Sequence, residues 1–487
     1  RVSITTNGKS DAMMNLTPGA AVGDDEPVMV MLAALPLLMH PEARSAAVIG
    51  IGSGISSHVL LASDSLRELD TIEIEPAMVE AARGFHPFNA SVFSDSRSRI
   101  HIEDAKTFFS AHGRRYDIIV SEPSNPWVSG VASLFSEEFY RRIRRHLEPG
   151  GLFVQWLQLY EIEPLLVASV IKALALSFPN YVVYAPDDGN LIIVASEGAA
   201  VPAPLEVALR QPRLAAALAR LQVRNVVDVE VMRVGSRRVL QPYFDRFPIG
   251  PNSDYFPVLD QNAARSRFMN AGAQEIAELS SMPIPAMEIL GGEARQGAEV
   301  PSRPWLRRSA LIHSAQKQLA YLMSGEESYL DGIPPGWRSD AQLFRHVLLE
   351  CPSRGGVQTV DQLLTVAGRM LPVLSKHESA MLWQKLRDAP CPAAKLHAEW
   401  IAVLAAVDAR DVRAMTLSAE PLLAPGRFAP GAHGDYLLAA AVLGRLALGD
   451  RKMALSLWHR YSPLAKSNPA GKLPEFIQAH LAAQVKN

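Results

Sequence analysis

Three glycines at alternate positions, Gly50, Gly52 and Gly54, follow an apolar run and precede a helical pattern. Amides at the start of a helix attract negative charge and polar ligand groups, and glycine lets a ligand approach a backbone that a side chain would block. The next two apolar runs end in acids, Glu73 and Asp104. Glu73 lies about 20 residues after the loop, where an acid accepts hydrogen bonds from ribose hydroxyls. The pattern predicts a nucleoside site.

A further acid, Glu122, ends the apolar run of residues 116–121. A carboxylate at this place can hold an ammonium group, take up its proton and orient the lone pair of the amine. Trp127 is expected either to pack on a cation through its ring face or to form a hydrophobic plug. Polar residues that end the fifth run either contact an acceptor or face solvent. The candidate acceptor contacts are Asn125, Trp127, Gln155, Gln158 and Tyr160.

The elements that must position these residues alternate between strand and helix. Strand patterns at 45–52, 69–76, 98–104, 116–123 and 150–160 are each followed by a helical pattern, the first at 56–66, and residues 180–196 have the pattern of a hairpin. Five strand–helix units ending in a hairpin predict an α/β fold with a doubly wound sheet and an antiparallel edge. The glycine loop with an acid at each of the next two strand ends resembles the Rossmann sheet of class I methyltransferases.

Composition shifts predict four parts. Residues 1–40 form a strand, a turn at Asn7-Gly8, a loop and a helix; residues 41–265 form the S-adenosyl-binding domain; residues 266–303 form a linker; and residues 304–487 are all helical. Residues 397–415 and 435–455 share a helix, a tight acidic turn and a second helix, about 40 residues apart, which weakly resembles tetratricopeptide hairpins. We therefore expect a helical repeat domain that either binds a protein partner or braces the S-adenosyl-binding domain.

Bulk composition excludes several classes of function. The chain has 487 residues and a net charge of −2, which argues against a broad nucleic-acid surface. Two cysteines, Cys351 and Cys391, cannot supply a disulfide framework or a four-ligand zinc site, and the histidines lack metal-ligand spacing, so no metal is expected. The longest apolar run, 28–39, is too short to span a bilayer. The expected location is cytoplasmic, with a membrane tether if a spanning segment precedes Arg1.

Longer motifs make the resemblance more specific. They are VIGIGSG at 48–54, IEIEPAMVEAAR at 72–83, EDAKTFF at 103–109, SEPSNPWVSGVASLFSEEFY at 121–140 and GPNSDYFPVLD at 250–260. Together they resemble the polyamine aminopropyltransferases (spermidine synthases), most closely the bacterial branch often fused to a membrane domain. Members of this family transfer an aminopropyl group from decarboxylated S-adenosylmethionine to a diamine. The resemblance also implies a homodimer.

The resemblance assigns roles to individual residues. It implies that Glu73 binds the ribose, that Asp104 binds the adenine amino group, and that Glu122 is the base at the first position of an Asp-x-x-Asp-Pro motif. The implied nucleoside contacts of the loop are Gly50, Gly52, Ser53 and Gly54. The acceptor is a small-molecule amine, and the co-substrate is decarboxylated S-adenosylmethionine or S-adenosylmethionine itself.

Four departures from the family pattern reduce the charge of the site. Ser53 replaces the acid that pairs with the aminopropyl ammonium, and Asn125 replaces the second acid of the catalytic motif. Glu122 is one methylene longer than Asp, and Val28-Met29 stand where the family has a Tyr-His or Tyr-Gln pair. Each lost ion contact weakens binding by about 1–3 kcal/mol.

Three hypotheses follow from these departures. The first is an aminopropyltransferase-like enzyme with an altered catalytic motif. The second is a methyltransferase that uses intact S-adenosylmethionine, because Ser53 does not repel the carboxylate of that donor. The third is a non-catalytic binding or scaffold protein on the same fold.

Overall fold

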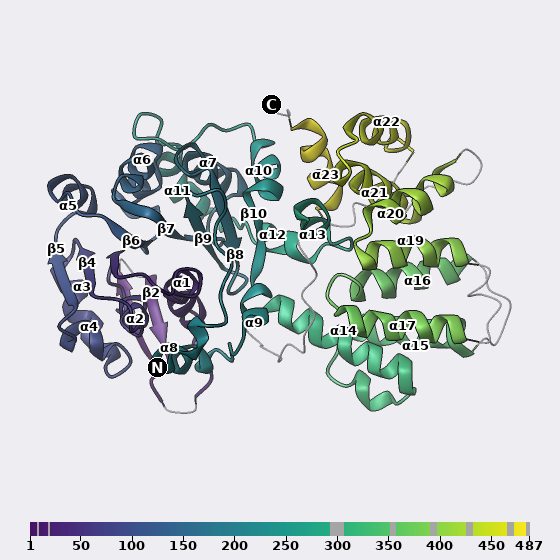
Figure 1. The fold of residues 1–487 in the computed structure, drawn as a ribbon, viewed down its shortest axis with the longest axis horizontal. Coiled ribbons are helices and arrows are strands. Elements are labelled where there is room, and N and C mark those ends of the chain that lie inside the picture. The colour runs from purple at the N-terminus through teal and green to yellow at the C-terminus, as the bar shows by residue number, and fades with distance from the viewer. Residues whose placement is uncertain are drawn as a thin grey trace. The chain divides into compact units, whose positions relative to one another are not determined.

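The computed structural model describes residues 1–6, 9–17, 20–292, 306–350, 357–389, 397–424, 432–464 and 472–483. The Asn7-Gly8 turn and the cysteines Cys351 and Cys391 lie outside these residues. The chain divides into two compact units, Arg1–Ala277 and Glu278–Asn487 (Figure 1). Each unit is described by itself below.

An eight-stranded sheet forms the centre of the first unit (Figure 1). Its order is β10-β8-β9-β7-β6-β3-β4-β5. Strands β3 to β7 are parallel, β9 is antiparallel to both β7 and β8, and β10 is antiparallel to β8. This is the predicted doubly wound, class I methyltransferase-like sheet with an antiparallel edge, although β10 was not predicted. The bounds are β3 Ser45–Ile49, β4 Glu68–Glu73, β5 Ser98–Ile102, β6 Tyr116–Ser121, β7 Leu147–Gln158, β8 Asn180–Tyr184, β9 Asn190–Ser196 and β10 Arg233–Ser236.

The register of the parallel strands brings their polar ends to one edge. Ile49 pairs with Ile72 on one side and with Ser121 on the other, so the residues that follow β3, β4 and β6 are neighbours. The chain leaves β3 towards β4 and β5 and returns to the other side of β3 with β6. Ligands bind at such a reversal of strand order, at the carboxyl ends of the strands.

Helices cover both faces of this sheet. Helices α1 and α2 pack on one another, as do α5 and α6 and then α6 and α7 (Figure 1). The bounds are α1 Glu26–Met39, α2 Ile55–Leu60, α3 Pro76–Ala82, α4 Ala90–Ser94, α5 Ala105–Ala111, α6 Glu137–Arg144, α7 Pro164–Ser177, α8 Pro212–Arg220, α9 Val226–Glu230, α10 Arg237–Asp245 and α11 Val258–Phe268.

The helix predicted over 56–66 ends at Leu60. The guanidinium group of Arg97 explains this early end, because it donates hydrogen bonds to the backbone carbonyls of Leu61, Ser63 and Leu66. These carbonyls belong to the turn after α2, whereas the last carbonyls of the helix, Val59 O and Leu60 O, accept from the backbone amides of Ala62 and Ser63. The chain therefore turns into β4 without a longer helix.

Residues before α1 form a second, two-stranded sheet of β1 Val2–Thr6 and β2 Lys9–Met14. The second strand was not predicted, because its Lys-Ser-Asp start has low strand propensity. The segment is attached to the main fold through Arg220 of α8. This side chain donates to the carbonyl oxygen of Asn15 and forms an ion pair with the fully buried Glu26.

The described part of the second unit contains helices and no strand, as predicted. Asp411 and Asp450 explain the predicted acidic turns, because their side chains accept hydrogen bonds from the first backbone amides of α20 and α22. Assignment to the tetratricopeptide type stays a prediction. Short helices α12 Glu275–Glu278 and α13 Ala286–Gly291 form within the expected linker. The longer helices are α14 Arg307–Ser324, α15 Pro335–Phe344, α16 Val357–Met370, α17 Lys376–Asp388, α19 Ala398–Ala409, α20 Val412–Ala419, α21 Ala432–Ala447, α22 Arg451–Tyr461 and α23 Leu473–Ala482.

Among all the helices described, none combines the length and the apolar character needed to cross a bilayer.

Candidate active site

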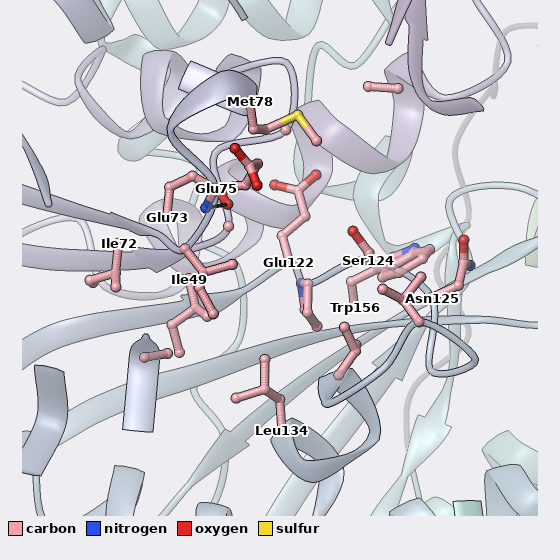
Figure 2. Close-up of a pocket in the computed structure, with 18 of the residues that line it drawn as sticks. Ile49, Ile72, Glu73, Glu75, Met78, Glu122, Ser124, Asn125, Leu134 and Trp156 are labelled. Atoms are coloured by element: carbon pink, nitrogen blue, oxygen red, sulfur yellow. Dashed lines mark hydrogen bonds between the residues drawn. The ribbon is translucent and has the colours of Figure 1, made fainter. Parts of the chain in front are cut away.

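A cavity of about 410 Å³ opens at the carboxyl ends of β3 to β7. The loops after these strands, the segment that precedes and begins α1, and residues 128–134 line it. In the view of Figure 2, Glu122 is drawn between the acids Glu73 and Glu75 and the side chains of Asn125 and Trp156. The predicted site residues on its wall are Gly50, Gly52, Ser53, Glu73, Asp104, Glu122, Asn125 and Tyr160.

The glycine loop brings backbone close to both the fourth strand and the cavity. Gly50 has φ +89°, and a Cβ there would lie 2.4 Å from the carbonyl oxygen of Glu122. Gly52 has φ +47°, and a Cβ there would meet no atom within 4 Å. Gly50 therefore permits β3 and β6 to approach, whereas Gly52 borders open space on the cavity wall.

Gly54 and Ser53 support the loop from behind. Gly54, with φ +78°, packs against the side chain of Asn89, whose amide nitrogen donates to the carbonyl oxygens of Ser53 and Ala82. The hydroxyl of Ser53 contacts Met29 Sδ of α1 and accepts a hydrogen bond from Ile55 N. Gly54 itself is not on the cavity wall, and Asn89 is a supporting residue that the sequence analysis missed.

Glu73 and Asp104 occupy the strand ends where the sequence places them. The two oxygens of Glu73 accept hydrogen bonds from Ile51 N and Glu75 N, both at 2.9 Å, so the carboxylate joins the glycine loop to the end of β4. Each carboxylate oxygen has a further lone pair that can accept from a ribose hydroxyl. Asp104 caps α5 by accepting from Thr107 N and Thr107 Oγ1 and remains exposed at the cavity wall.

Glu122 extends from the end of β6 into the site. Its Oε2 accepts a hydrogen bond of 2.6 Å from Ser56 Oγ of α2. Burial raises the pKa of Glu122 to about 8, the Ser56 hydrogen bond opposes this rise, and the charge of Asp25 adds to it. A carboxyl group with this pKa can take up and release a proton near neutral pH.

The opposite part of the wall carries a chain of hydrogen bonds. Trp156 Nε1 donates to Asn190 Oδ1, and Asn190 Nδ2 donates to both oxygens of Asp187. Burial raises the pKa of Asp187 to about 6. Nearby, Asn125 Nδ2 donates to the hydroxyl of Tyr160. Trp156 and Asn190 line the cavity and were missed, because their side-chain hydrogen bond joins β7 to β9 across 34 positions and leaves no local signal in the sequence.

Three predicted acceptor contacts are not among the lining residues, namely Trp127, Gln155 and Gln158. Trp127 packs beside Tyr160 and under the guanidinium group of Arg267. Gln155 donates to the backbone and side chain of Ser121 inside the sheet. Gln158 is fully buried, and neither of its amide atoms has a hydrogen-bond partner among the described residues. These three residues are close in sequence to residues of the wall, but strand pairing and side-chain packing direct their side chains elsewhere.

One further polar residue holds the wall formed by residues 130–135. Asn252 Nδ2 donates to the carbonyl oxygens of Ala132 and Phe135, and its Oδ1 accepts from Leu259 N. Asp254 of the same motif forms an ion pair with Lys106 of α5 and, among the described residues, makes no hydrogen bond to this wall. The bracing residue is therefore Asn252, two positions earlier in the same motif.

The charged groups of the cavity are all of one sign. Among the lining residues, all of them in the described part of the chain, there is no Lys, Arg or His. The acids on the wall are Asp25, Glu73, Glu75, Glu103, Asp104 and Glu122. A cavity of this charge concentrates cationic ligands and disfavours a ligand with an unpaired carboxylate.

Comparison with known proteins agrees with the motifs in the sequence. Residues 26–194 match the Spermine/spermidine synthase domain. This part of the chain is called the spermidine synthase-like domain below. The domain is similar to the polyamine aminopropyltransferase of Moorella thermoacetica, with 31% identity over 189 residues, 38% of this chain and 66% of the relative. It is also similar to that of Lachnoclostridium phytofermentans, with 28% identity over 124 residues, 26% of this chain and 44% of the relative.

The spermidine synthase-like domain thus spans about two thirds of the first relative and less than half of the second. Among solved structures, a spermidine synthase in complex with the transition-state analogue AdoDATO is 25% identical, with a TM-score of 0.32 over 36% of this chain and 62% of the other.

Proposed function

We propose that the spermidine synthase-like domain transfers an aminopropyl group from a decarboxylated S-adenosylmethionine-type nucleoside to an amine. The observation that carries this proposal is the acidic lining of the cavity, which has six carboxyl groups and no basic residue among the lining residues described. The decarboxylated donor carries a sulfonium and an ammonium group and no carboxylate, so it complements such a wall. Intact S-adenosylmethionine would bring its carboxylate among like charges without a basic partner.

The open space beside Gly52, together with Glu73 and Asp104, supports placement of the nucleoside across the ends of β3, β4 and β5. In this placement Glu73 accepts from the ribose hydroxyls, and Asp104 accepts from the adenine amino group. Glu122 and Asp25 then face the reacting end of the donor and the acceptor amine.

Glu122 acts as the general base in the proposed reaction. The acceptor enters as an ammonium ion, because aliphatic amines have a pKa near 10. Glu122 takes one proton from it, and the freed lone pair attacks the carbon beside sulfur. The new C–N bond forms as the C–S bond breaks, and its electron pair stays on sulfur, which becomes a neutral thioether. The secondary amine product keeps the positive charge, and the proton on Glu122 passes to solvent.

Methyl transfer from intact S-adenosylmethionine is the second candidate. Ser53 favours it, because this position has no acid to bind an aminopropyl ammonium, and its hydroxyl instead contacts Met29.

Calorimetric titration with each donor, followed by mass spectrometry of products made from a mixture of amines, tests the proposal. We expect the decarboxylated donor to bind at least tenfold more tightly and an aminopropyl product to form. Glu122→Gln should remove product formation and retain donor binding. Glu80→Gln, which changes an exposed acid on α3 outside the cavity, should alter neither. Tighter binding of the intact donor would support methyl transfer, and binding of neither would support a scaffold role.

A further inference from the structure

The buried hydroxyl group of Ser56 has one proton to donate and lies within hydrogen-bond distance of two acceptors. Ser56 lies in α2, is 2% exposed, and is absent from the motifs that indicated the site. Its Oγ is 2.6 Å from Glu122 Oε2 and 2.9 Å from the carbonyl oxygen of Met29 in α1. A hydroxyl group donates one hydrogen bond and accepts up to two, so it cannot donate to both oxygens at once.

The protonation state of Glu122 decides which arrangement forms. When Glu122 is ionised, Ser56 donates to the carboxylate, as the short distance favours. When Glu122 is protonated, its own hydroxyl can donate to Ser56 Oγ, which then donates to Met29 O. In both states the proton of the Ser56 hydroxyl has an acceptor, and the two states differ by one rotation of this hydroxyl.

We propose that Ser56 is a positioning residue that holds the Glu122 carboxyl group in one orientation through proton uptake and release. This inference rests on the proposed function, because it assumes that Glu122 handles the proton of the acceptor. The second acceptor of the Ser56 hydroxyl, Met29 O, belongs to the backbone of α1. Every residue of α1 is buried, so this oxygen is held in place.

The other charged groups around Glu122 are all negative. Asp25 precedes α1, Glu73 ends β4 and Glu75 follows it. Helix α2 contributes only uncharged side chains apart from His58, which faces Ser91. Ser56 is therefore the neutral donor that stabilises the ionised form of Glu122 where no cation does so. Removing it should make the ionised form harder to reach.

Ser56→Ala tests this role, with Ser57→Ala as a matched control. Ser57 is also buried in α2, but its hydroxyl pairs with Thr71 and not with Glu122. We expect Ser56→Ala to raise the pKa of Glu122 by about one unit, measured by ¹³C NMR of labelled glutamate with Glu122→Gln for assignment. The alkaline shift should also appear in the pH profile of kcat, with KM for the donor changed less than twofold. Ser56→Thr should restore both.

The NMR titration separates this inference from the proposed function, since it needs no turnover. If the wild-type protein forms no aminopropyl product but Ser56→Ala still shifts the Glu122 titration, the proposed function fails and the pairing stands. An unmoved titration in Ser56→Ala, or an equal shift in Ser57→Ala, overturns the inference. If Ser56→Ala does not fold, Ser56→Cys keeps the volume with a weaker donor and should shift the titration in the same direction.

Discussion

Substitution of Gly50 by alanine perturbs the place where the glycine loop meets the fourth strand. The added Cβ would lie 2.4 Å from Glu122 O, whereas carbon and oxygen normally approach to about 3.3 Å. The strands β3 and β6 would have to separate by almost 1 Å at the residue that carries the proposed base. Overpacking of this kind costs about 1–3 kcal/mol.

The left-handed backbone adds a second cost. At φ +89° an alanine is strained by about 1–2 kcal/mol, partly offset by the lower freedom of alanine in the unfolded chain. We therefore expect Gly50→Ala to lower the free energy of unfolding by about 3 kcal/mol. Gly52→Ala shares the positive φ but meets no atom within 4 Å. It should cost only about 1 kcal/mol and should instead weaken nucleoside binding tenfold or more.

Hydrogen exchange at increasing urea, followed on peptides from β3 and β6, reports the stability of the first unit alone. Calorimetric titration with the donor reports binding. Equal stability of the two variants would refute the close-approach argument for Gly50. Wild-type affinity in Gly52→Ala would refute the assignment of the open space at Gly52 to the nucleoside.

Two further predictions concern pH and the cavity wall. Glu122 has a pKa of about 8 in the folded chain against an ordinary value of 4.5, so the stabilisation from its neutral form is complete below about pH 4.5 and is lost as the pH rises through about 8. The free energy of unfolding of Glu122→Gln, relative to that of the wild type, should therefore rise between about pH 5 and about pH 9 in urea titrations. If the difference between the two free energies stays constant over this range, the carboxyl group of Glu122 is not buried in the folded chain. Asn252→Ala removes three hydrogen bonds to buried backbone and should cost about 3 kcal/mol. Asn262→Ala, which removes one bond within α11, should cost about 1 kcal/mol or less by the same thermal or urea measurement.

The sequence predicted the sheet well because its signals are local. Runs such as Ile118-Ile119-Val120 are fully buried, as the central strands of a sheet covered by helices on both faces require. The acids that follow these runs were predictable for the same reason, since the carboxyl ends of parallel strands share one edge. By contrast, β10 forms only because it pairs with β8, and the early end of α2 depends on hydrogen bonds from Arg97. Both partners lie far along the chain.

The parts of the site that could not be predicted are contacts between distant segments. Ser56 meets Glu122 across 66 positions and Asn252 meets Ala132 across 120 positions, and neither spacing leaves a periodic signal. Asp25 was visible within the DDE motif, but its place on the cavity wall depends on how α1 docks. Trp127 was expected to pack on a cation or to form a hydrophobic plug, and the sequence around it gives no sign that the guanidinium group of Arg267, 140 positions later, lies over its ring.

The complete burial of α1 has a consequence for biosynthesis. This helix packs against β7 and β9, and β9 begins about 150 residues after α1 ends, which corresponds to roughly 10–30 s of translation. Throughout that interval the surface of α1 that packs on β9 has no permanent cover, although α2 already packs on this helix, and that surface is a binding site for chaperones or proteases. The folded first unit is thus expected to form only after the hairpin has emerged from the ribosome, and slow translation before residue 196 should reduce its yield.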